Sequence, residues 1–454
     1  MQALRGDTQD YTKGSLRKAV FMLAIPMIIE MGMESVFALV DLFFVGKLGK
    51  HAVSTVGLTE SVLTVIYSLA IGASMAATAL VARRVGEKNP EGASRTAMQA
   101  IWLGLALILV ISGTGFYYAD RILSFMGAEP ETIAIGTTYT RIMMGSSTVI
   151  MLLFLINGIF RGAGDASLAM KSLTIANICN IILCPVLVKG LGPVPEMGLT
   201  GAAVATCIGR GIGVLYQLYH LFNGRGVVKL TKSSLVLEWG LIRSLVKVGS
   251  PATLQFIIAS CSWIFLAQLV AETGHSEASA GYQTALRILM FFLLPAWGLS
   301  NAAATLVGQS LGAGDPARAE AAVLTTAKYN TLFMASVMLL FLLGARPVVS
   351  LFAVQAGVRD VAVTALRIVS CGYIFYGVGM VLTNAFNGAG DTRTPTYINL
   401  FGFWAFQIPL AYLLAKYMEL GPLGVFIAIP VSETAITIAS YILFRKGRWK
   451  TVAV

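Results

Sequence analysis

The chain has 454 residues, of which 56% are hydrophobic and only 12% are charged. A soluble protein of this size carries about a quarter charged residues, so the composition excludes a soluble protein and indicates one with many membrane spans. The net charge of +11 would suit nucleic-acid binding, but basic loops beside anionic lipid account for it. We expect the lipid bilayer, and no nucleic acid, as a partner.

Apolar stretches of about 20 residues, the length of a membrane-crossing helix, recur along the whole chain. We predict an all-α polytopic membrane protein with twelve transmembrane helices. In chain order they are 17–45, 53–82, 94–118, 132–160, 166–188, 198–222, 241–272, 277–309, 320–343, 361–387, 395–416 and 423–444. The polar first 18 residues are too long for the basic start of a signal peptide, so we expect no removable signal.

The distribution of Lys and Arg predicts the orientation of the chain. With the N-terminus in the cytoplasm, 22 of the 33 basic residues fall on cytoplasmic segments, 7 on outside segments and 4 within spans. Lys and Arg concentrate on the cytoplasmic side of membrane proteins. We therefore expect a multi-pass protein of the plasma membrane, the inner membrane of a prokaryote, with both termini in the cytoplasm.

The chain contains an internal repeat. The sequence RGAGD at 161–165 returns as NGAGD at 387–391, and Pro26 returns as Pro251, with nearly the same offset in residue number. Each half has six spans, an even number, so both halves enter the membrane in the same direction. This predicts two parallel six-helix repeats around a central cleft. We expect an N-terminal lobe (1–222), a cytoplasmic linker (223–240) and a C-terminal lobe (241–454).

Three acids lie in the first span, PMIIEMGMESVFALVDLFFVG. At 100° per residue, Glu34 lies about 40° and Asp41 about 20° from Glu30 around the helix, and Pro26 is on the same stripe. One acid at the centre of a membrane costs roughly 3 kcal/mol. The shared face therefore predicts a wet cavity or a polar cluster, and a proton or cation path along it. A structural hydrogen bond is the alternative for Glu30, and Pro26 is a candidate hinge.

Four segments of the chain resemble one family. They are the GAGD loops after the fourth and tenth spans, VDLFFVGKLG at the end of the first, NICNIILCPVLVKGLG in the fifth and MGLTGAAVAT at the start of the sixth. They resemble the multidrug and toxic compound extrusion (MATE) transporters, over essentially the whole chain, and point to the DinF-like branch. The resemblance implies export of organic cations or other amphipathic compounds, driven by protons or sodium ions.

The resemblance also implies a coupling site in the N-terminal lobe. It assigns Asp41 to the acidic residue of that site and Asn180 to its asparagine. Asn177, Asn180 and Cys184 lie at helical spacing on one face, and Thr206 adds a hydroxyl. Cys184 stands where many relatives have Asp, and a thiol is a poor ligand for a hard ion. This favours protons over Na⁺, for which Asp41 and Asn180 are the alternative ligands. Helix–helix hydrogen bonding is the alternative role of the asparagines.

The second half lacks the acids of the first span. The repeat partners of Glu30, Glu34 and Asp41 are Gln255, Ala259 and Leu266, so we expect coupling in the N-terminal lobe. Four further residues are candidates for a substrate cleft: Glu60, Tyr139, Tyr282 and Tyr376. We assign no role to Glu433, and we interpret Arg141 and Arg367 as structural.

We therefore predict a secondary antiporter, not an enzyme, that exports cationic or amphipathic drugs through alternating access. No phosphate-binding loop for ATP is present, so we expect the energy to come from an ion gradient or from a partner subunit. The scattered cysteines and histidines form no metal-binding pattern, and we expect no cofactor and a monomer. The alternatives are a sodium-coupled drug antiporter and a flippase for lipids or lipid-linked sugars. A non-transporting membrane scaffold is a third reading.

Overall fold

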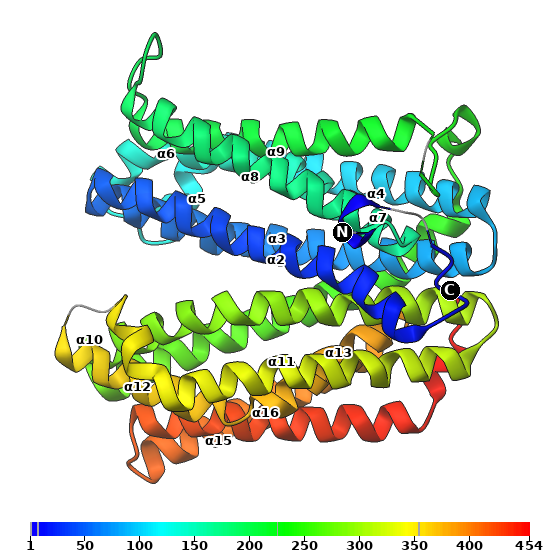
Figure 1. Ribbon diagram of the computed structural model, residues 1–454. Helices are drawn as coiled ribbons and strands as arrows, with labels where there is room; N and C mark the ends of the chain where they lie inside the picture. Colours follow the sequence, from blue (N-terminus) through cyan, green and yellow to red (C-terminus); the bar gives the residue numbers. More distant parts are fainter. Residues whose placement is uncertain (1, 7–8, 225, 353–354) are drawn as a thin grey trace. The chain divides into compact units, whose positions relative to one another are not determined.

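The computed structural model describes residues 2–6, 9–224, 226–352 and 355–454. Residues 1, 7–8 and 353–354 of the predicted lobes and Arg225 of the predicted linker lie outside the described residues. The regular structure in the described residues is helical, without a β-strand (Figure 1). This agrees with the all-α fold that the hydropathy predicts.

The first half of the chain contains nine α-helices in its described part. They are α1 (Gln2–Arg5), α2 (Leu16–Val45), α3 (Lys50–Gly86), α4 (Pro90–Tyr117), α5 (Ala119–Phe125), α6 (Pro130–Gly145), α7 (Ser147–Ala163), α8 (Ala166–Lys189) and α9 (Gly198–Phe222), with the short 3₁₀ turns η1 (Gly46–Leu48) and η2 (Lys232–Leu235).

The second half begins with the long helix α10 (Trp239–Gly312). It continues with α11 (Pro316–Ser350), α12 (Ala356–Ser370), α13 (Tyr373–Gly388), α14 (Arg393–Asn399), η3 (Leu400–Gln407), α15 (Ile408–Tyr412), η4 (Leu413–Tyr417), α16 (Pro422–Arg445) and η5 (Arg448–Thr451). The segments η3 and η4 are π-helical. They interrupt one continuous apolar helix over Arg393–Tyr417.

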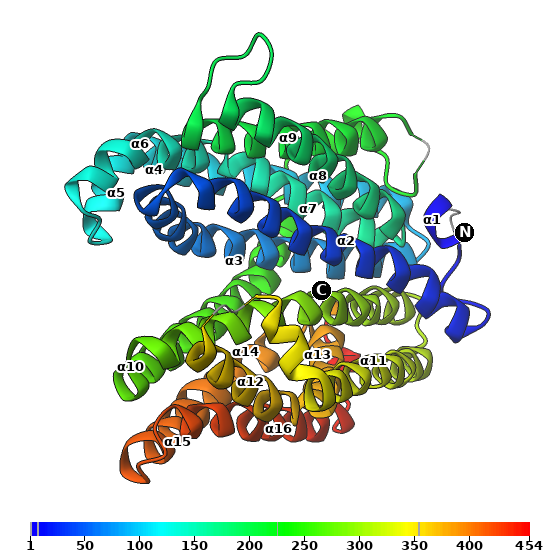
Figure 2. The ribbon, with the colours of Figure 1, turned by 60° about the vertical axis from the view of Figure 1, so that its left-hand side comes forward.

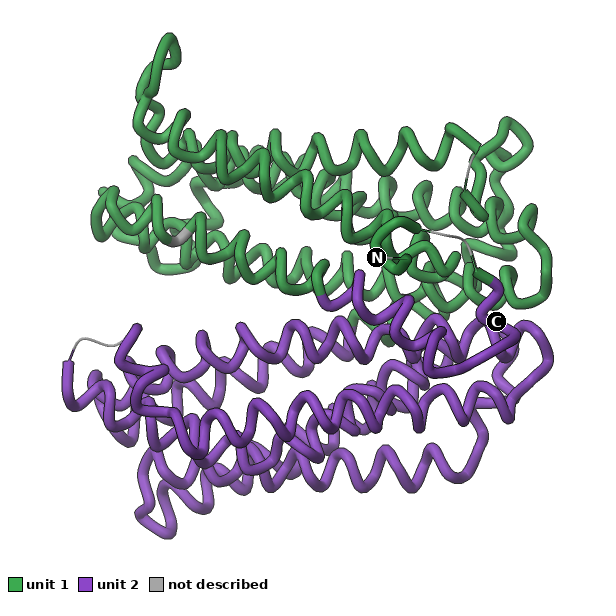
Figure 3. Tube along the Cα trace, in the orientation of Figure 1, with its two compact units in different colours: residues 1–9, 29–253 green, residues 10–28, 254–454 purple. Residues whose placement is uncertain are grey.

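Two compact units divide the chain (Figure 3). The first unit contains residues 1–9 and 29–253, and the second contains residues 10–28 and 254–454. Helix α2 therefore contributes its first part to the second unit and its acidic part to the first. The lobe and linker boundaries given above stay predictions.

In its described part, the structure has ten helices that are long and apolar enough to cross a membrane, or eleven if the bent pair α12 and α13 is one span. This count takes α10 as a single span, although its 74 residues would extend over about 110 Å. That length exceeds three times the hydrocarbon thickness of about 30 Å. His275 has non-helical dihedral angles (φ 60°, ψ −158°), and α10 doubles back on itself (Figure 2). The predicted spans 241–272 and 277–309 lie on either side of His275.

The internal repeat is visible in the backbone. Gly164 and Gly390, which occupy the same place in the two GAGD motifs, both have φ of 85°. This left-handed conformation suits glycine because it has no Cβ, and it ends helices. Each of these glycines follows one helix of its half and precedes the next. The GAGD sequences therefore make the same turn twice.

Candidate functional site

The three acids of α2 meet three different sets of partners in the first unit. Glu30 has the most buried set, since only 1% of its surface is exposed. Its Oε1 accepts hydrogen bonds from Arg161 Nη1 (2.9 Å) and Asn157 Nδ2 (3.0 Å), both on α7. Arg161 also donates through Nη2 to Ser74 Oγ on α3 (2.8 Å). Glu30 thus forms a buried ion pair that joins three helices.

A polar chain continues from the Glu30 pair into the first unit. The Asn157 Oδ1 accepts hydrogen bonds from Gln217 Nε2 on α9 (2.6 Å) and from Ser172 Oγ on α8 (3.0 Å). Gln217 also donates to the carbonyl oxygen of Leu153 (3.0 Å). Buried polar groups need such partners. The network therefore fixes how these helices pack and supports a structural role for Glu30.

Glu34 forms the second ion pair. Its Oε1 accepts from Arg210 Nη2 on α9 at 2.9 Å, and the Arg210 side chain is almost fully buried. The Arg210 guanidinium also lies over the ring of Phe37, 4.4 Å from its centroid, and 5.8 Å from that of Tyr67. Aromatic faces stabilise a cation by their quadrupole. Arg210 is therefore held by one carboxylate and two rings.

Asp41 is bound by neutral groups. Its Oδ1 accepts from Asn180 Nδ2 on α8 (3.0 Å), and its Oδ2 accepts from Thr206 Oγ1 on α9 (3.2 Å). The two helices come close together at Gly209, where a Cβ would lie 2.8 Å from the carbonyl oxygen of Ala176. This approach places the amide and the hydroxyl on the same carboxylate.

The charges on this face do not balance. Three carboxylates on α2 meet two guanidinium groups, so the ionised cluster carries one net negative charge. Glu30 and Glu34 each have an arginine in an ion pair. Asp41 accepts its hydrogen bonds from two neutral side chains, and within the described residues it has no ion pair. The unbalanced charge therefore falls on Asp41, which lies within electrostatic range of Arg210 but leaves the ion pair to Glu34.

The second half replaces the Glu30 pair with a neutral set. At the corresponding repeat positions, Gln255 stands for Glu30 and Asn387 stands for Arg161. Gln255 and Asn387 are both buried, as their counterparts are. Acid and base are therefore lost together, as expected if each is tolerated inside the membrane only with the other.

The Glu34 pair follows the same rule. In the second half, Ala259 stands at the repeat position of Glu34 and Ile436 stands at that of Arg210. Again both charges are absent from the second half. The ion pairs are thus properties of the first unit and are not required by the shared fold.

In the described residues, the remaining predicted coupling residues form no hydrogen bond with the Asp41 carboxylate. Asn177 donates to the carbonyl oxygen of Leu173 in its own helix (2.9 Å). Cys184 is completely buried in a hydrophobic cluster that contains Tyr139 and Val188. The structure brings Asn180 and Thr206 to Asp41, and it gives Asn177 and Cys184 other surroundings.

The four predicted cleft residues also have different surroundings. In the first unit, Glu60 is exposed on α3 and Tyr139 is buried in the cluster around Cys184. In the second unit, Tyr282 is buried against Phe426, with ring centroids 5.7 Å apart. Tyr376 lines a small cavity beside α16.

Sequence reasoning missed the two arginines. Arg161 belongs to the RGAGD motif just after the predicted span 132–160, and Arg210 lies within the predicted span 198–222, and the sequence analysis gives neither a role. A signal existed, because a buried guanidinium inside a membrane needs an acid and α2 has three. The pairing itself depends on which helices are neighbours, and this is not encoded in the periodicity.

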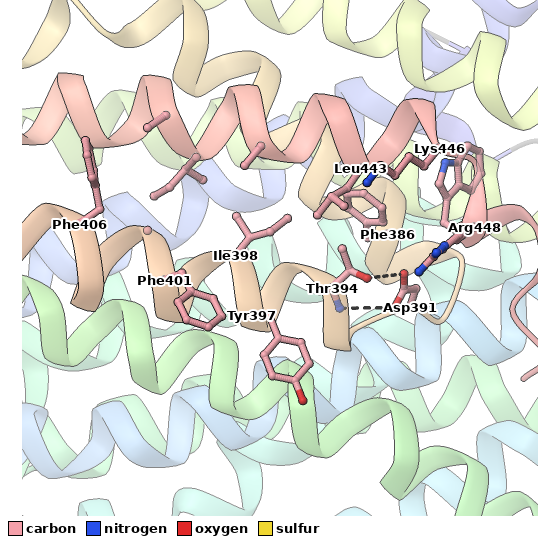
Figure 4. Close-up of a pocket in the computed structure, with 15 residues that line it drawn as sticks. Phe386, Asp391, Thr394, Tyr397, Ile398, Phe401, Phe406, Leu443, Lys446 and Arg448 are labelled. Carbon is pink, nitrogen blue, oxygen red and sulfur yellow. Dashed lines mark hydrogen bonds between the residues drawn. The ribbon is translucent and has the colours of Figure 1, made fainter.

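A groove of about 510 Å³ lies on the second unit, between α13, η3 and α16. Figure 4 shows Lys446 and Arg448 at one end, near Asp391, and Phe401 and Phe406 towards the other. Its walls are mainly apolar side chains. The groove combines a cationic end with a long apolar part. Such a groove is complementary to a ligand with an anionic head and an apolar chain.

A family model matches the chain twice. The model described as MatE matches residues 26–186 and 251–413, so the two matches begin at Pro26 and Pro251, in agreement with the internal repeat. A relative from Thermotoga maritima, "Probable multidrug resistance protein NorM", is 26% identical over 97% of this chain and 94% of its own length. The "FAD transporter" of Shewanella oneidensis is 25% identical over 97% of each chain.

Solved structures resemble the whole chain. A structure described as "Crystal structure of MATE in the straight conformation" is 27% identical, covers 100% of both chains and has a TM-score of 0.92. One described as "Crystal structure of MATE in the bent conformation" is also 27% identical, covers 98% of this chain and 97% of that chain, and has a TM-score of 0.90. These likenesses confirm the predicted fold class.

Proposed function

Because the chain belongs to the MatE family of membrane transporters, we propose that it exports cationic or amphipathic compounds in exchange for protons, with Asp41 as the proton acceptor. It is a multi-pass membrane transporter, not an enzyme, and the multidrug resistance name of its relative supports drug export by secondary transport. The coupling ion and the role of Asp41 are the parts that we propose.

The observation that carries the proposal is the unbalanced charge at Asp41. Glu30 and Glu34 have arginine partners, so their protonation would leave a buried guanidinium without its counterion. Asp41 has only an amide and a hydroxyl as hydrogen-bond donors in the described residues. Its protonation brings the cluster from one net negative charge to neutrality, which is the cheaper change in a low-dielectric environment. The corresponding residue of the second half is Leu266, which cannot bind a proton. The proposed function therefore resides in the first unit.

This charge arithmetic explains why transport would be an exchange. The ionised cluster attracts one cation, either an organic substrate or a proton. A proton bound to an Asp41 oxygen forms the neutral carboxylic acid and removes the charge that holds the substrate. Substrate binding and proton binding then exclude each other, which is the thermodynamic requirement for antiport.

The donor set at Asp41 supports a proton over Na⁺. The amide of Asn180 donates its N–H to Asp41, and in the described residues its Oδ1 has no hydrogen-bond partner. With this amide oxygen, the Asp41 carboxylate and the Thr206 hydroxyl, the site offers four side-chain oxygens, whereas a hard cation takes six or so oxygen ligands. Cys184 adds no oxygen to the set.

Pro26 supports a bending step in α2. It lies inside the helix, where proline removes one backbone hydrogen bond and favours a kink. Glu30 lies one helical turn further along, so a bend would move the acidic face. The bent and straight descriptions of two similar structures agree with this reading, and we propose Pro26 as the hinge.

The test uses proteoliposomes that contain a fluorescent organic cation and carry either a pH gradient or a Na⁺ gradient. We expect the pH gradient alone to drive dye export, and Asp41→Asn to abolish the coupling. Asp120→Asn, an exposed residue of α5, is the matched control and should transport normally. Export by Asp41→Asn at the control rate would refute the role of Asp41, and export driven by Na⁺ alone would refute proton coupling.

The groove beside α16 favours lipid flipping as the second candidate function. An anionic lipid would place its phosphate near Lys446 and Arg448 and its chain along Phe401. Adding lipid-linked substrate or FAD to the same vesicles separates the candidates. If the lipid-linked substrate inhibits dye export, the result would support a flippase. If the Asp41→Asn variant exports FAD at the wild-type rate, the result would point to an anionic substrate.

A further inference from the structure

Glu433 on α16 is a buried acid that the proposed function does not use. Only 7% of its surface is exposed. Among the described residues it has neither a hydrogen-bond donor nor an ion-pair partner, in contrast to Glu30 and Glu34. An ionised carboxylate without a partner is strongly disfavoured in such surroundings, so an uncompensated charge at Glu433 is not a stable arrangement.

A small cavity adjoins Glu433. It has a volume of about 20 Å³ and is lined by Trp263 and Pro430, by Tyr373 and Tyr376 of α13, and by aliphatic side chains. About 10–15 Å³ measured in this way holds one water molecule. The Tyr373 hydroxyl is buried and has no hydrogen-bond partner in the described part of the protein. Two polar groups without protein partners thus border a space of the size of one water molecule.

The charged surroundings of Glu433 are simple. The elements packed on α16 include α12, α13, α14, η3, α15, η4 and η5, and α10 contributes Trp263, Leu289 and Leu293 to the cavity. Of these lining residues, only Glu433 and the phenols of Tyr373 and Tyr376 are titratable. In the described part of the chain, no Lys, Arg or His forms an ion pair with Glu433. The cavity is also too small for an organic cation.

The internal repeat relates Glu433 to the Asp41 site. Ser432 occupies the repeat position of Thr206, which donates to Asp41, so Glu433 corresponds to Cys207. The second half has Leu266 in place of the acid of the first span and has an acid, Glu433, on α16, the helix that corresponds to α9. In the described residues, each unit therefore contains an intramembrane acid without an arginine partner.

We propose that Glu433 is a second protonation site of this protein, which holds a proton as a neutral carboxylic acid beside one cavity water. When the cavity opens to further water, the O–H bond breaks, the proton passes to that water as hydronium and the carboxylate remains in contact with water. The use of this proton in transport rests on the proposed function, whereas its presence on Glu433 does not. With both sites active, two protons would move in each cycle.

Infrared difference spectroscopy of the full-length protein in lipid nanodiscs tests the site directly. We expect the wild type at neutral pH to show a carboxylic acid C=O band that Glu433→Gln removes and Asp41→Asn retains. The band should shift to lower frequency when the cavity water is exchanged for D₂O, and Tyr376→Phe should move it. Glu320→Gln, at an ion pair with Arg445, is the matched control and should leave the band unchanged.

Two results would overturn the proposal. The first is a carboxylate band, in place of the acid band, as the signal that Glu433→Gln removes at neutral pH. The second is loss of the acid band when NaCl replaces KCl, which would assign the cavity to Na⁺. If Glu433→Gln does not fold, the Tyr376→Phe shift decides: an acid band that neither moves with Tyr376→Phe nor shifts in D₂O is not that of Glu433. Both readouts are independent of transport, so failure of the antiport assay leaves this test intact.

Discussion

Replacing Arg161 with Asn removes the cation of the most buried ion pair and inserts the residue that the second half has at the same repeat position. Glu30 loses its 2.9 Å contact with Arg161 and keeps the 3.0 Å hydrogen bond from Asn157. Because Glu30 is 1% exposed, bulk water contributes little to stabilising its charge. Ser74 also loses the donor at 2.8 Å.

The loss of stability depends on how Glu30 responds to the missing cation. Glu30 either stays charged or takes up a proton, and the response that costs less free energy sets the size of the loss. Leaving one partner of a buried pair charged costs about 3–5 kcal/mol. Protonating a glutamic acid of ordinary pKa, about 4.3, costs about 3.7 kcal/mol at pH ~7 and about 1 kcal/mol at pH ~5. The lost hydrogen bond to Ser74 adds about 1 kcal/mol. We therefore expect Arg161→Asn to lower the free energy of unfolding by about 4–5 kcal/mol at the higher pH and about 2 kcal/mol at the lower.

The sign of the pH dependence follows from proton binding. At neutral pH the folded variant binds a proton on Glu30 that the unfolded chain does not bind. Stability then falls as pH rises and recovers as pH falls towards the ordinary glutamate pKa. The wild type, with its ion pair intact, should show a smaller recovery.

The decisive control is the double variant Glu30→Gln with Arg161→Asn, which recreates the neutral set of Gln255 and Asn387. Its free energy of unfolding should lie within about 1.5 kcal/mol of the wild-type value, because replacement of a buried ion pair by neutral residues is often tolerated. Reversible denaturant unfolding in mixed micelles, at both pH values, measures all four members of the cycle. A double variant as unstable as Arg161→Asn, or a loss of stability that does not change with pH, would refute the reasoning.

Two further predictions concern the surroundings of Asp41. Gly209→Ala places a Cβ 2.8 Å from the Ala176 carbonyl oxygen and 3.2 Å from Asn180 N, so thermal unfolding should show a loss of about 1–3 kcal/mol and export should slow. The control Gly211→Ala, with no atom within 4 Å of its Cβ, should change stability by less than about 0.5 kcal/mol, and equal effects of the two would contradict this account. Cys184→Asp adds a carboxylate within electrostatic range of Asp41. We expect it to lower Tm in KCl and to regain part of the loss in NaCl, and the same Tm in both salts would count against a Na⁺ site there.

The sequence predicts the helices and the repeat well because both follow from local patterns. Apolar length gives the spans, and the constant offset between GAGD motifs gives the two halves, whose glycines Gly164 and Gly390 have the same φ. The turn near His275 is also predicted, because it lies within the four residues that separate the spans 241–272 and 277–309, directly after Gly274. What the sequence does not give is the single residue at which the chain changes direction.

The site is predictable only in part, because helical periodicity gives faces and not neighbours. It places Glu30, Glu34 and Asp41 on one side of α2, but the arginine partners lie 131 and 176 residues further along the chain. Which arginine meets which acid depends on the arrangement of α7 and α9 around α2. Glu433 has no local pattern at all, and its isolation is visible only once α13 and the cavity are in place.

The π-helical segment η3 records a change of length inside a membrane helix. Asn180 shares Asp41 with Thr206 of α9, and Gln407 donates to Ser432 of α16, which occupies the repeat position of Thr206. The stretch from Asp391 to Gln407 is one residue longer than the stretch from Asp165 to Asn180. Between these points the second half therefore holds one residue more than the first. A π turn absorbs the extra residue where it occurs, so the helix after it keeps its faces instead of rotating by about 100°. Duplicated halves can thus diverge in length within the bilayer while their packing survives.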